Sequence, residues 1–559
     1  MTEIDWIIMG GTLILIALYG SWKTRENRNI ESYLKGSNSM SWGAIGLSVM
    51  ATQASAITFL STPGQAYESG MGFVQFYFGL PLAIIVLCSV MLPIYYRLKV
   101  YTAYEYLESR FDLRVRLFTA FLFLISRGLA AGITIYAPAI ILSSILGWNL
   151  NLMNLMVGLV VILYTVSGGT RAVALTQKWQ MAVIMLGMFI AFGLLIYYIP
   201  TDFGTSLELA GIMGRMEVID LSFDINNRYT IWSGLTGGFF LALSYFGTDQ
   251  SQVQRYLGGK DLKASKIGLY FNAWLKIPMQ FFILLTGVLV FVFFQFNDSP
   301  AFFNQVARES MLSSKNASQY EQLEQEFDEI HAEKQTLINA YSENRNEEYA
   351  QQIKALDISE KEKRGEIKEL IAQTDSELET KDSDYIFITF ILNYLPIGIV
   401  GLLLAVILSA AMSSTAGELN ALASTTVIDF YKRIWKPEAS EKHYLLVSRL
   451  FTLFWGLMAI LFAVLAQLVD NLIQAVNILG SLFYGTILGI FVVAFFLPHV
   501  KSKAVFWAAL FSEISVLLLF KFSEIGFLMF NVIGCFIVVV LSILLQAGKQ
   551  DLSKAPSSP

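Results

Sequence analysis

Thirteen stretches of the chain are long and apolar enough to cross a lipid bilayer, and this strongly constrains its fold. About 20 apolar residues suffice for one crossing as an α-helix. Because a lipid-exposed backbone must satisfy its hydrogen bonds internally, each stretch is expected to be helical. The predicted spans lie near residues 5–21, 41–61, 73–96, 117–145, 152–167, 178–200, 230–254, 267–296, 386–412, 444–467, 471–498, 504–520 and 525–546. The sequence therefore predicts an all-α membrane protein.

The composition excludes a soluble globular protein. Hydrophobic residues make up 55% of the chain and charged residues 15%, whereas soluble domains have roughly 45–50% and about 25%. Cys88 and Cys535 both lie in apolar stretches, so neither a disulfide framework nor a metal cluster is predicted. The histidines His331, His443 and His499 are scattered without a nucleophile or metal constellation. An enzyme is therefore not expected.

Charged residues beside the first span and in the connections predict the orientation of the chain. Glu3 and Asp5 precede the first span, and Lys23, Arg25 and Arg28 follow it. Basic residues then recur in alternate connections, which the positive-inside rule assigns to the cytoplasm. This order is the reverse of a secretory signal peptide, so the first span should be retained. We predict a multi-pass protein of the cell (inner) membrane, with its N-terminus outside and its C-terminus cytoplasmic.

One connection, residues 297–385, is unlike the others. It carries 21 of the chain's 44 acidic residues and 10 of its 39 basic residues, and the predicted topology places it outside. The 3-4 spacing of a coiled-coil seam, broken at Lys334, is kept by Tyr320, Leu323, Phe327, Ile330, Leu337 and Tyr341. A second periodic run comprises Tyr349, Ile353, Leu356, Ile367, Leu370 and Ile371. These runs predict an antiparallel helical hairpin standing on the membrane.

Two roles remain open for this insertion. It is either a docking site for a protein partner or a gating element, or else a tolerated insertion without a role in transport.

The chain is divided into five parts. They are 1–40, an extra N-terminal span and cytoplasmic loop; 41–296, a first repeat and the start of a second; 297–385, the acidic insertion; 386–498, the rest of the second repeat; and 499–559, two extra spans and a cytoplasmic tail.

The apolar stretch 401–433 contains two adjacent hydroxyl residues, Ser413 and Ser414. Polar groups inside a span are costly and therefore indicate function. Small hydroxyl residues can instead let neighbouring helices approach closely. For the serine pair alone, both interpretations stay open.

Two spans contain residues that favour an interrupted helix. The segment 41–70 carries Gly43, Gly46 and Pro63 among polar and apolar residues, and the segment 231–255 carries four glycines with Tyr245 between them. Discontinuous membrane helices expose backbone carbonyls that coordinate Na⁺ and polar solutes in secondary transporters. The two segments lie five spans apart, as an inverted repeat of five helices predicts. Close helix packing is the alternative explanation of their glycines.

The chain resembles the sodium/solute symporters from about Trp42 to Ala494, leaving out the 297–385 insertion. The resemblance rests on six motifs in order: 50-MATQASAITFLSTPGQAYESG-70, 101-YTAYEYLESRF-111, 135-IYAPAIIL-142, 167-SGGTRAVALTQKWQ-180, 247-GTDQSQVQRYLGGKDLKASK-266 and 410-AAMSSTAGELNA-421. Within the family it is most similar to the branch with vitamin, iodide, monocarboxylate and sialic acid carriers. The resemblance implies a leucine-transporter-like fold, an inverted repeat of five plus five helices.

The resemblance also implies a sodium site. Its ligands would be backbone carbonyls of Ala51, Ala54 and Ala410 and the hydroxyls of Ser413 and Ser414. Na⁺ is a hard cation that prefers oxygen ligands, which agrees with the hydroxyl pair. A second sodium site in some members relies on an acidic residue where this chain has Gln177. Coupling to one sodium ion is therefore expected.

For the solute, the resemblance implies contacts from the first interrupted span and from spans facing it. They are Gln53, Ser55, Thr58, Gln75, Phe76, Arg127 and Tyr245. Lys276 falls where some sugar carriers place a solute-contacting lysine, but it could equally extend to the headgroups. Arg127 could bind a solute carboxylate, pair with an internal acid or line a cytoplasmic vestibule. Asp249 and Glu418 are candidate internal partners or gate residues.

We therefore expect a sodium-coupled secondary symporter that imports a small polar or anionic organic solute by alternating access. Sodium is the expected coupling ion. The alternative is a transporter-derived solute sensor that acts through the external hairpin or a partner. The polar groups of the interrupted span suit a sugar, sialic acid, vitamin, monocarboxylate or inorganic anion alike, so the sequence does not select the solute.

Overall fold

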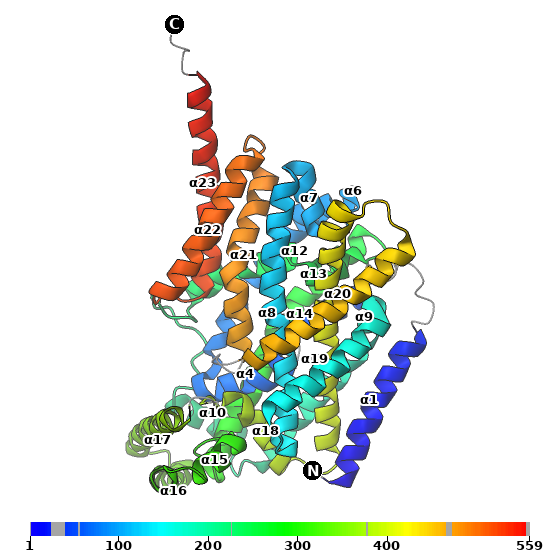
Figure 1. Ribbon diagram of the computed structural model, residues 1–559. Coiled ribbons are helices and arrows are strands. Elements are labelled where there is room, and N and C mark those ends of the chain that lie inside the picture. Colours follow the sequence, from blue (N-terminus) through cyan, green and yellow to red (C-terminus); the bar gives the residue numbers. More distant parts are fainter. Residues whose placement is uncertain are drawn as a thin grey trace.

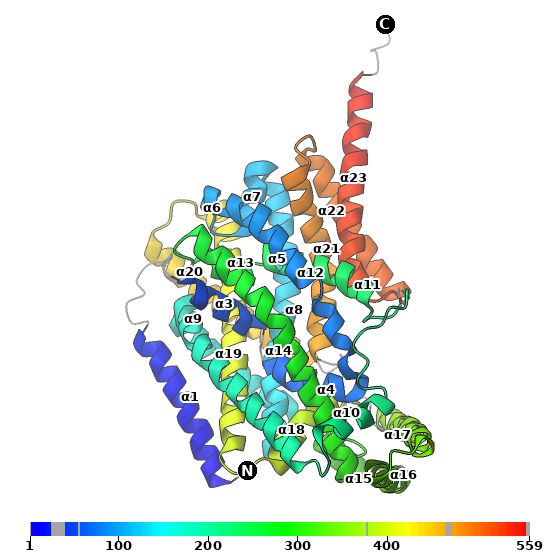
Figure 2. The same ribbon diagram turned by 180° about the vertical axis from the view of Figure 1, so that it is seen from behind.

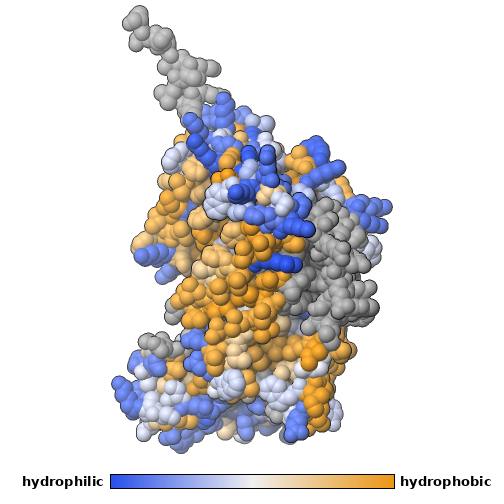
Figure 3. All heavy atoms as spheres, turned by 45° about the vertical axis from the view of Figure 1, so that its right-hand side comes forward, coloured by the Kyte–Doolittle hydropathy of each residue, from blue (hydrophilic) through white to orange (hydrophobic). Residues whose placement is uncertain are grey.

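A computed structural model of the protein describes residues 2–23, 40–53, 56–224, 226–375, 378, 380–465 and 472–554. Within them the prediction of an all-α protein is confirmed, since the only β feature is an isolated bridge between Met40 and Gly259. Most long helices run along one axis of a bundle (Figures 1 and 2). The N-terminus lies at the same end as the insertion, and the C-terminus projects from the opposite end (Figure 1). Apolar side chains form a band between two hydrophilic ends (Figure 3).

The first half of the chain runs through α1 (Glu3–Lys23), α3 (Trp42–Gln53), α4 (Ala56–Ser69), η2 (Gly70–Tyr77), α5 (Leu80–Val86), η3 (Leu87–Met91), α6 (Leu92–Leu98), α7 (Ala103–Arg110), α8 (Leu113–Leu146), α9 (Leu150–Tyr198) and α10 (Phe203–Ile212). It continues through α11 (Ile231–Ser233), η4 (Gly234–Gly238), α12 (Phe239–Thr248), α13 (Gln250–Leu257) and α14 (Leu262–Phe296).

The second half contains α15 (Gln305–Leu312), α16 (Ala317–Glu343), α17 (Glu347–Thr374), α18 (Ser383–Tyr394), α19 (Ile399–Thr425), η5 (Thr426–Trp435), α20 (Glu441–Leu465), α21 (Leu472–Phe496), α22 (Ser502–Phe522) and α23 (Leu528–Lys554).

By length and hydropathy, nine helical stretches of the described residues can cross a membrane, compared with the thirteen predicted spans. The predicted spans near 5–21, 41–61, 152–167, 230–254 and 386–412 do not match one of the nine over their full length. The last is divided between α18, which ends at Tyr394, and α19, which begins at Ile399. One of these five is short because the helix breaks at Asp249: α12 has 10 residues. The stretch Leu150–Leu163 is apolar and helical but shorter than the nine.

Helix α9 covers two predicted spans, and the connection between them is itself helical. Its two ends pack on different neighbours. Gly158 lies against Ile460 of α20, whereas Gly187 lies against Leu403 of α19. Gln180 also donates to the backbone carbonyl of Ser409 in α19, at 3.3 Å. The helical connection therefore leads from a peripheral helix back to the helix with the serine pair.

The first interrupted span consists of α3 and α4, and α14 packs along both. A Cβ on Gly46 would collide with Phe271, and one on Gly287 would overlap the backbone of Pro63. These glycines therefore serve close helix packing. Residues 54 and 55, between α3 and α4, lie outside the described residues, so the predicted interruption of this span is not tested there. Gln53 ends α3, and its carbonyl accepts a hydrogen bond from Thr58 Oγ1 at 2.8 Å.

The second interrupted span breaks at Asp249, between α12 and α13. Asp249 has an extended conformation (φ −77°, ψ 118°), and its carboxylate caps α13 by accepting from the Ser251 amide at 2.8 Å. The glycine-rich stretch from Gly234 to Gly238 instead forms a π-helical turn that continues into α12. The break is thus made by an N-capping acid rather than by glycine.

Helix α19, which carries the serine pair, is capped from a distance by α1. Asp5 accepts hydrogen bonds from the amides of Gly398, at 2.7 Å, and Gly401, at 3.2 Å. A carboxylate is favourable at a helix N-terminus because it satisfies free amides and the helix dipole. Asp5, one of the acidic residues from which the orientation of the chain was predicted, therefore also anchors α1 to α19.

Helices α16 and α17 form the antiparallel hairpin that the insertion predicts. They are seen nearly end on in Figure 1, whereas the spanning helices are seen from the side, so the hairpin lies across the end of the bundle rather than standing on it. Lys368 pairs with Glu68 at 3.2 Å and with Asp382 at 2.9 Å. Arg364 pairs with Asp382 at 2.6 Å. These ion pairs tie the hairpin to the end of α4 and the start of α18.

The seam of the hairpin runs through Lys334 instead of breaking there. Lys334 is buried with Phe327, His331 and Ile338, and its ammonium pairs with Glu360 and lies 3.6 Å from Asp357. His331 contacts the other oxygen of Glu360 at 2.7 Å. Burial raises the pKa of Glu360, but His331 and Lys334 outweigh it and hold the pKa below its ordinary value. The sequence interpretation missed this because the acids lie on the other helix.

Replacing Lys334 with methionine is expected to destabilise the hairpin by about 3 kcal/mol, since it leaves two buried carboxylates without that ammonium. Hydrogen exchange of α16 and α17 in the purified protein would measure the loss. The exposed Lys354→Met variant of the same hairpin serves as the control. Equal exchange in both variants would contradict a stabilising role of the buried lysine.

Candidate solute and sodium site

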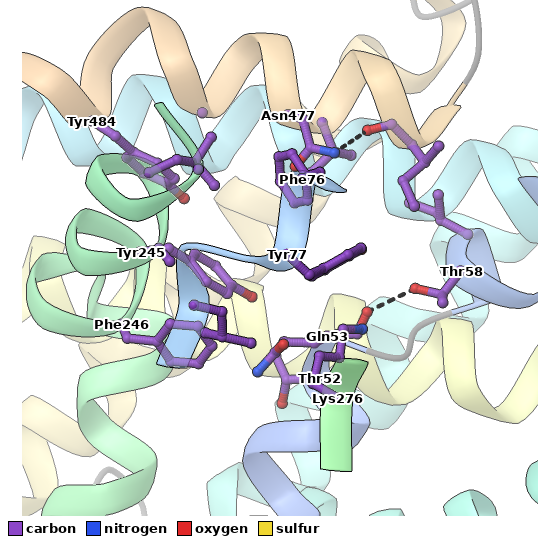
Figure 4. A pocket seen from close by; sticks show the side chains of 18 of the residues that line it. Thr52, Gln53, Thr58, Phe76, Tyr77, Tyr245, Phe246, Lys276, Asn477 and Tyr484 are labelled. Carbon is purple, nitrogen blue, oxygen red and sulfur yellow. Dashed lines mark hydrogen bonds between the residues drawn. The ribbon is translucent and has the colours of Figure 1, made fainter. Parts of the chain in front are cut away.

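A cavity lies at the centre of the bundle, where the two interrupted spans face α8, α14, α19 and α21. Aromatic rings of Phe76, Tyr77, Tyr245, Phe246 and Tyr484 gather around it (Figure 4). Its other lining residues are Thr52, Gln53, Ile57, Thr58, Leu80, Arg127, Thr134, Gly238, Leu241, Ala242, Lys276, Ser414, Glu418, Ile473, Val476, Asn477 and Gly480. A mostly apolar cavity with a few converging polar groups is typical of a small-molecule site.

Five of the seven solute residues predicted from sequence line this cavity: Gln53, Thr58, Phe76, Arg127 and Tyr245. Ser55 lies outside the described residues. The side-chain amide of Gln53 donates to Asn272 Oδ1 of α14 at 3.2 Å. The Tyr245 hydroxyl accepts from Gln252 Nε2 at 2.6 Å. The first interrupted span therefore supplies polar groups to a cavity whose opposite wall is aromatic.

Gln75 is the exception, because it does not line the cavity. Its amide nitrogen donates to the carbonyl of Tyr229 at 2.9 Å, and its amide oxygen accepts from the backbone of Asp220 at 3.0 Å. The side chain therefore holds the segment that precedes α11 against η2. Only the neighbouring residue, Phe76, lies on the cavity wall.

Arg127 reaches the cavity from α8, but internal acids engage its guanidinium. It pairs with Asp249 at the break of the second interrupted span and with Glu418 of α19 at 3.0 Å. Thr134 and Tyr484 complete the cluster: Thr134 donates to Glu418 at 2.9 Å and Tyr484 to Asp249 at 2.6 Å. Of the roles left open for Arg127, the geometry supports the internal ion pair.

Tyr484 and Asn477 are cavity residues that the sequence interpretation missed. Both lie on α21, in a segment that reads as an ordinary apolar span. The sequence signal that identifies them is the presence of polar side chains in a membrane helix. The same signal identified Ser413 and Ser414. Tyr484 lies one helical turn from Gly480, which also lines the cavity.

Lys276 is a buried cation without an acidic partner among the described residues. Its side chain is 1% exposed, so it does not extend to the headgroups. Its ammonium lies 5.2 Å from the centroid of the Tyr77 ring, at the cavity wall. Burying an ammonium is costly unless an anion or hydrogen-bond acceptors compensate it. Lys276 therefore presents a buried amine without an anionic partner among the described residues to whatever occupies the cavity.

The residues expected to bind sodium are consistent with a cation site at the edge of the same cavity. Ser414 Oγ is buried and has no hydrogen-bond partner among the described residues. Ala51 is buried in α3. Ala410 is buried one turn before Ser414. Ala54 lies outside the described residues, and the Ser413 side chain is likewise not described. The unpartnered Ser414 hydroxyl is an oxygen ligand of the kind that suits Na⁺.

Gln177 is engaged by a cation of the protein itself. Its side-chain oxygen accepts from Arg255 Nη1 at 2.9 Å and from Ser48 Oγ at 2.9 Å. Arg255 is fully buried at the end of α13. The departure from the family motif at position 177 is therefore matched by an arginine that contacts it.

An all-helical membrane bundle in which a span breaks at Asp249 beside a central cavity is typical of a transporter of the leucine-transporter-like class. The family follows from the sequence comparisons. The chain belongs to the sodium:solute symporter family, whose model matches residues 33–318 and 375–511. The unmatched residues between these ranges nearly coincide with α16 and α17. Members of this family are sodium-coupled solute transporters, so the expectation that the chain is not an enzyme is confirmed.

Several curated relatives transport anions by name. Sodium-coupled monocarboxylate transporter 2 of Mus musculus is 26% identical over 505 residues, 89% of this chain and 69% of the relative. The sodium/sialic acid symporter of Proteus mirabilis is 26% identical over 550 residues, 96% and 93% of the two chains. The human sodium/iodide cotransporter is 32% identical over 274 residues, 48% of this chain and 41% of the relative.

Solved structures confirm the fold. A substrate-bound, outward-open Na⁺-coupled sialic acid symporter superposes with a TM-score of 0.75 at 23% identity, covering 98% of both chains. A nucleobase-cation-symport-1 family transporter in a closed conformation superposes with a TM-score of 0.51 at 12% identity, covering 92% of this chain and 95% of the other.

Proposed function

We propose that the protein imports a small organic anion together with one sodium ion by alternating access. The observation that carries the solute class is Lys276, the buried ammonium at the cavity wall that lacks an acidic partner among the described residues. Arg127 does not provide a free charge because Asp249 and Glu418 neutralise it. A carboxylate would supply the charge and the acceptors that Lys276 lacks.

The sodium ion would bind between α3 and α19, with Ala51, Ala54, Ala410, Ser413 and Ser414 as ligands. The unpartnered Ser414 hydroxyl supports this assignment. Because Ser414 lines the solute cavity as well, sodium bound there would complete the positive side of the solute site. Binding of sodium and of an anion would then favour each other.

One sodium ion is sufficient for such a cycle. A tenfold sodium gradient supplies about 1.4 kcal/mol. With a monovalent anion the translocated pair is neutral, so the membrane potential of about 2.3 kcal/mol per charge per 100 mV does not contribute. The expected accumulation is therefore about tenfold for a tenfold sodium gradient.

Alternating access would use the two interrupted spans as moving parts. Asp249, at the break of the second span, contacts Arg127 of α8 and Tyr484 of α21. This cluster could separate when the bundle around α3 and α12 rocks against the other helices. We place the end with α16 and α17 outside the cell, in keeping with the basic connections of the other end.

Ser414→Ala is expected to weaken the apparent sodium affinity at least about tenfold, because it removes one of two side-chain ligands. The measurement is solute uptake into proteoliposomes against external sodium. Ser424→Ala is the matched control, since Ser424 is buried on the same helix and donates to its own turn, at 3.0 Å from the Ala421 carbonyl. Unchanged sodium dependence in Ser414→Ala would overturn the site.

A further inference from the structure

Helix α4 leads from the cavity toward the hairpin end of the bundle, and it contacts α21 on the way. Thr58 of α4 lines the cavity, whereas Glu68, near the end of the helix, pairs with Lys368 of the hairpin at 3.2 Å. Gln65 lies between them, and its Oε1 accepts from Gln474 Nε2 of α21 at 2.7 Å. Both glutamines are buried. This hydrogen bond therefore joins α4 to α21 between the cavity and the hairpin, and we call this junction the outer gate.

Asp384, at the start of α18, lies against the outer gate. Its Oδ2 accepts from the backbone amide of Leu472 in α21 at 3.3 Å, and the next residue, Ile473, lines the cavity. Helix α18 also packs closely on α4, because a Cβ on Gly64 would overlap the backbone of Ser383. Helix α18 and the hairpin lie at the same end of the bundle (Figure 1). The carboxyl group therefore lies where α4, α18 and α21 meet.

The Asp384 carboxyl group is buried with few partners. The residue is 3% exposed, and Oδ1 has no hydrogen-bond partner among the described residues. The Ser61 hydroxyl of α4 lies nearby without forming a hydrogen bond. The amide of Leu472 is thus the donor that contacts the group. Burial of an ionised carboxylate without a cation is costly, so the closed gate favours the protonated form.

The charged groups nearby do not supply a cation for Asp384. They are two acids, Glu68 of α4 and Asp382 of α18, and three cations that are already engaged, namely Lys368 and Arg364 of α17, which pair with these acids, and Arg228, which donates to Gln474 of α21 at 2.8 Å. Burial raises the pKa of Asp384 to about 7, and both acids contribute, although the Ser61 hydroxyl and the Leu472 amide oppose the rise.

We propose that Asp384 is a proton-binding site of the outer gate, which holds a proton while α4 and α21 are joined and releases it to the outside when they separate. This inference rests on the proposed function, because alternating access requires the hairpin end to open. When the gate opens, water hydrates the carboxyl group and favours its ionisation. The proton returns to the side from which it came, so it regulates the gate without being transported.

Acid outside the cell should therefore hold the gate closed. The pKa of Asp384 is about 7 in the closed gate, whereas a hydrated aspartate titrates near about pH 4. Between these two values opening releases a proton, so each pH unit of acidification lowers the open fraction up to about tenfold. Above about pH 7 the carboxyl group is ionised in both forms, and the dependence levels off.

The test is labelling of Val476→Cys, at a cavity-lining position of α21, by a membrane-impermeant thiol reagent applied to intact cells. From outside, the reagent reaches this position only while the outer gate is open. The chain's own cysteines, Cys88 and Cys535, are buried, so background labelling should be low. Asp384→Asn, neutral at every pH, is the reference, and dividing by its rate cancels the titration of the introduced thiol. The ratio should rise about tenfold from about pH 5.5 to about pH 7 and then level off.

A ratio that does not change with pH overturns the proton site and leaves alternating access intact. Absence of labelling at every pH overturns both, since the hairpin end would then not open. If Asp384→Asn does not fold, Glu68→Gln decides: it removes an acid beside Asp384 and should move the rise to lower pH. An unchanged profile in Glu68→Gln would then overturn the inference. Glu217→Gln, which changes an exposed acid near the same end, is the control and should leave the profile unchanged.

Discussion

Lys276→Met is expected to weaken binding of a solute carboxylate about a hundredfold while sodium still stabilises the protein. Truncating one partner of a desolvated charge pair costs about 2–5 kcal/mol, and 1.4 kcal/mol corresponds to a factor of ten. The ammonium is fully buried at the cavity wall, so water would not replace it. The measurement is a thermal-shift screen of small carboxylates in saturating sodium.

The probes are matched pairs: propionate, lactate and nicotinate against their primary amides. The unaltered protein should be stabilised by at least one carboxylate and not by its amide, and the difference should vanish in Lys276→Met. Lys263→Met is the control, since Lys263 is exposed on the same helix. If an amide stabilises as well as its acid, the lysine binds a neutral solute and the anion proposal is wrong.

Transport of one sodium ion with one monovalent anion is expected to produce no electrical current. One sodium ion and one monovalent anion carry no net charge, and Arg127 with its two acids stays inside the protein. The proposed solute class thus rests on Lys276 at the cavity wall.

The fold was largely predictable because its determinants are local. Apolar stretches of membrane length require helices, and hydroxyls or breakers inside them point to the central site. The all-α bundle, the family and the insertion between its matched parts all follow from such patterns. The sodium ligands expected from Ser413, Ser414 and their neighbours remain a prediction.

The rest could not be predicted because it depends on partners far apart in sequence. Gln177 and Arg255 are 78 residues apart, and Arg127 and Glu418 are 291 apart. From the sequence alone, Gln177 in place of an acid indicates only that a sodium site is lost. Its contact with Arg255 is evident only in the structure. Lys334 likewise interrupts the apolar seam of α16 in the sequence, and its pairing with Glu360 of α17 is known only from the structure. The sequence identifies such residues as unusual, and only packing supplies the reason.

Arg127→Met is expected to destabilise the protein by about 3–5 kcal/mol, because it leaves Asp249 and Glu418 as buried carboxylates without their cation. The reduction should appear as a lower thermal unfolding midpoint in detergent, even without solute. The triple variant Arg127→Met, Asp249→Asn, Glu418→Gln removes all three charges, and it should regain part of the lost stability because no buried charge is left unpaired.

Stability and solute binding together separate the two roles that the sequence leaves open for Arg127. If its task is the internal ion pair, carboxylate binding in Arg127→Met should fall only as far as folding does, and the triple variant should still bind. If stability is unchanged but carboxylate binding is lost, Arg127 holds the solute itself. The observed pairing favours the first outcome: Asp249, Glu418 and Tyr484 already surround the guanidinium, and a solute would have to displace an acid to reach it.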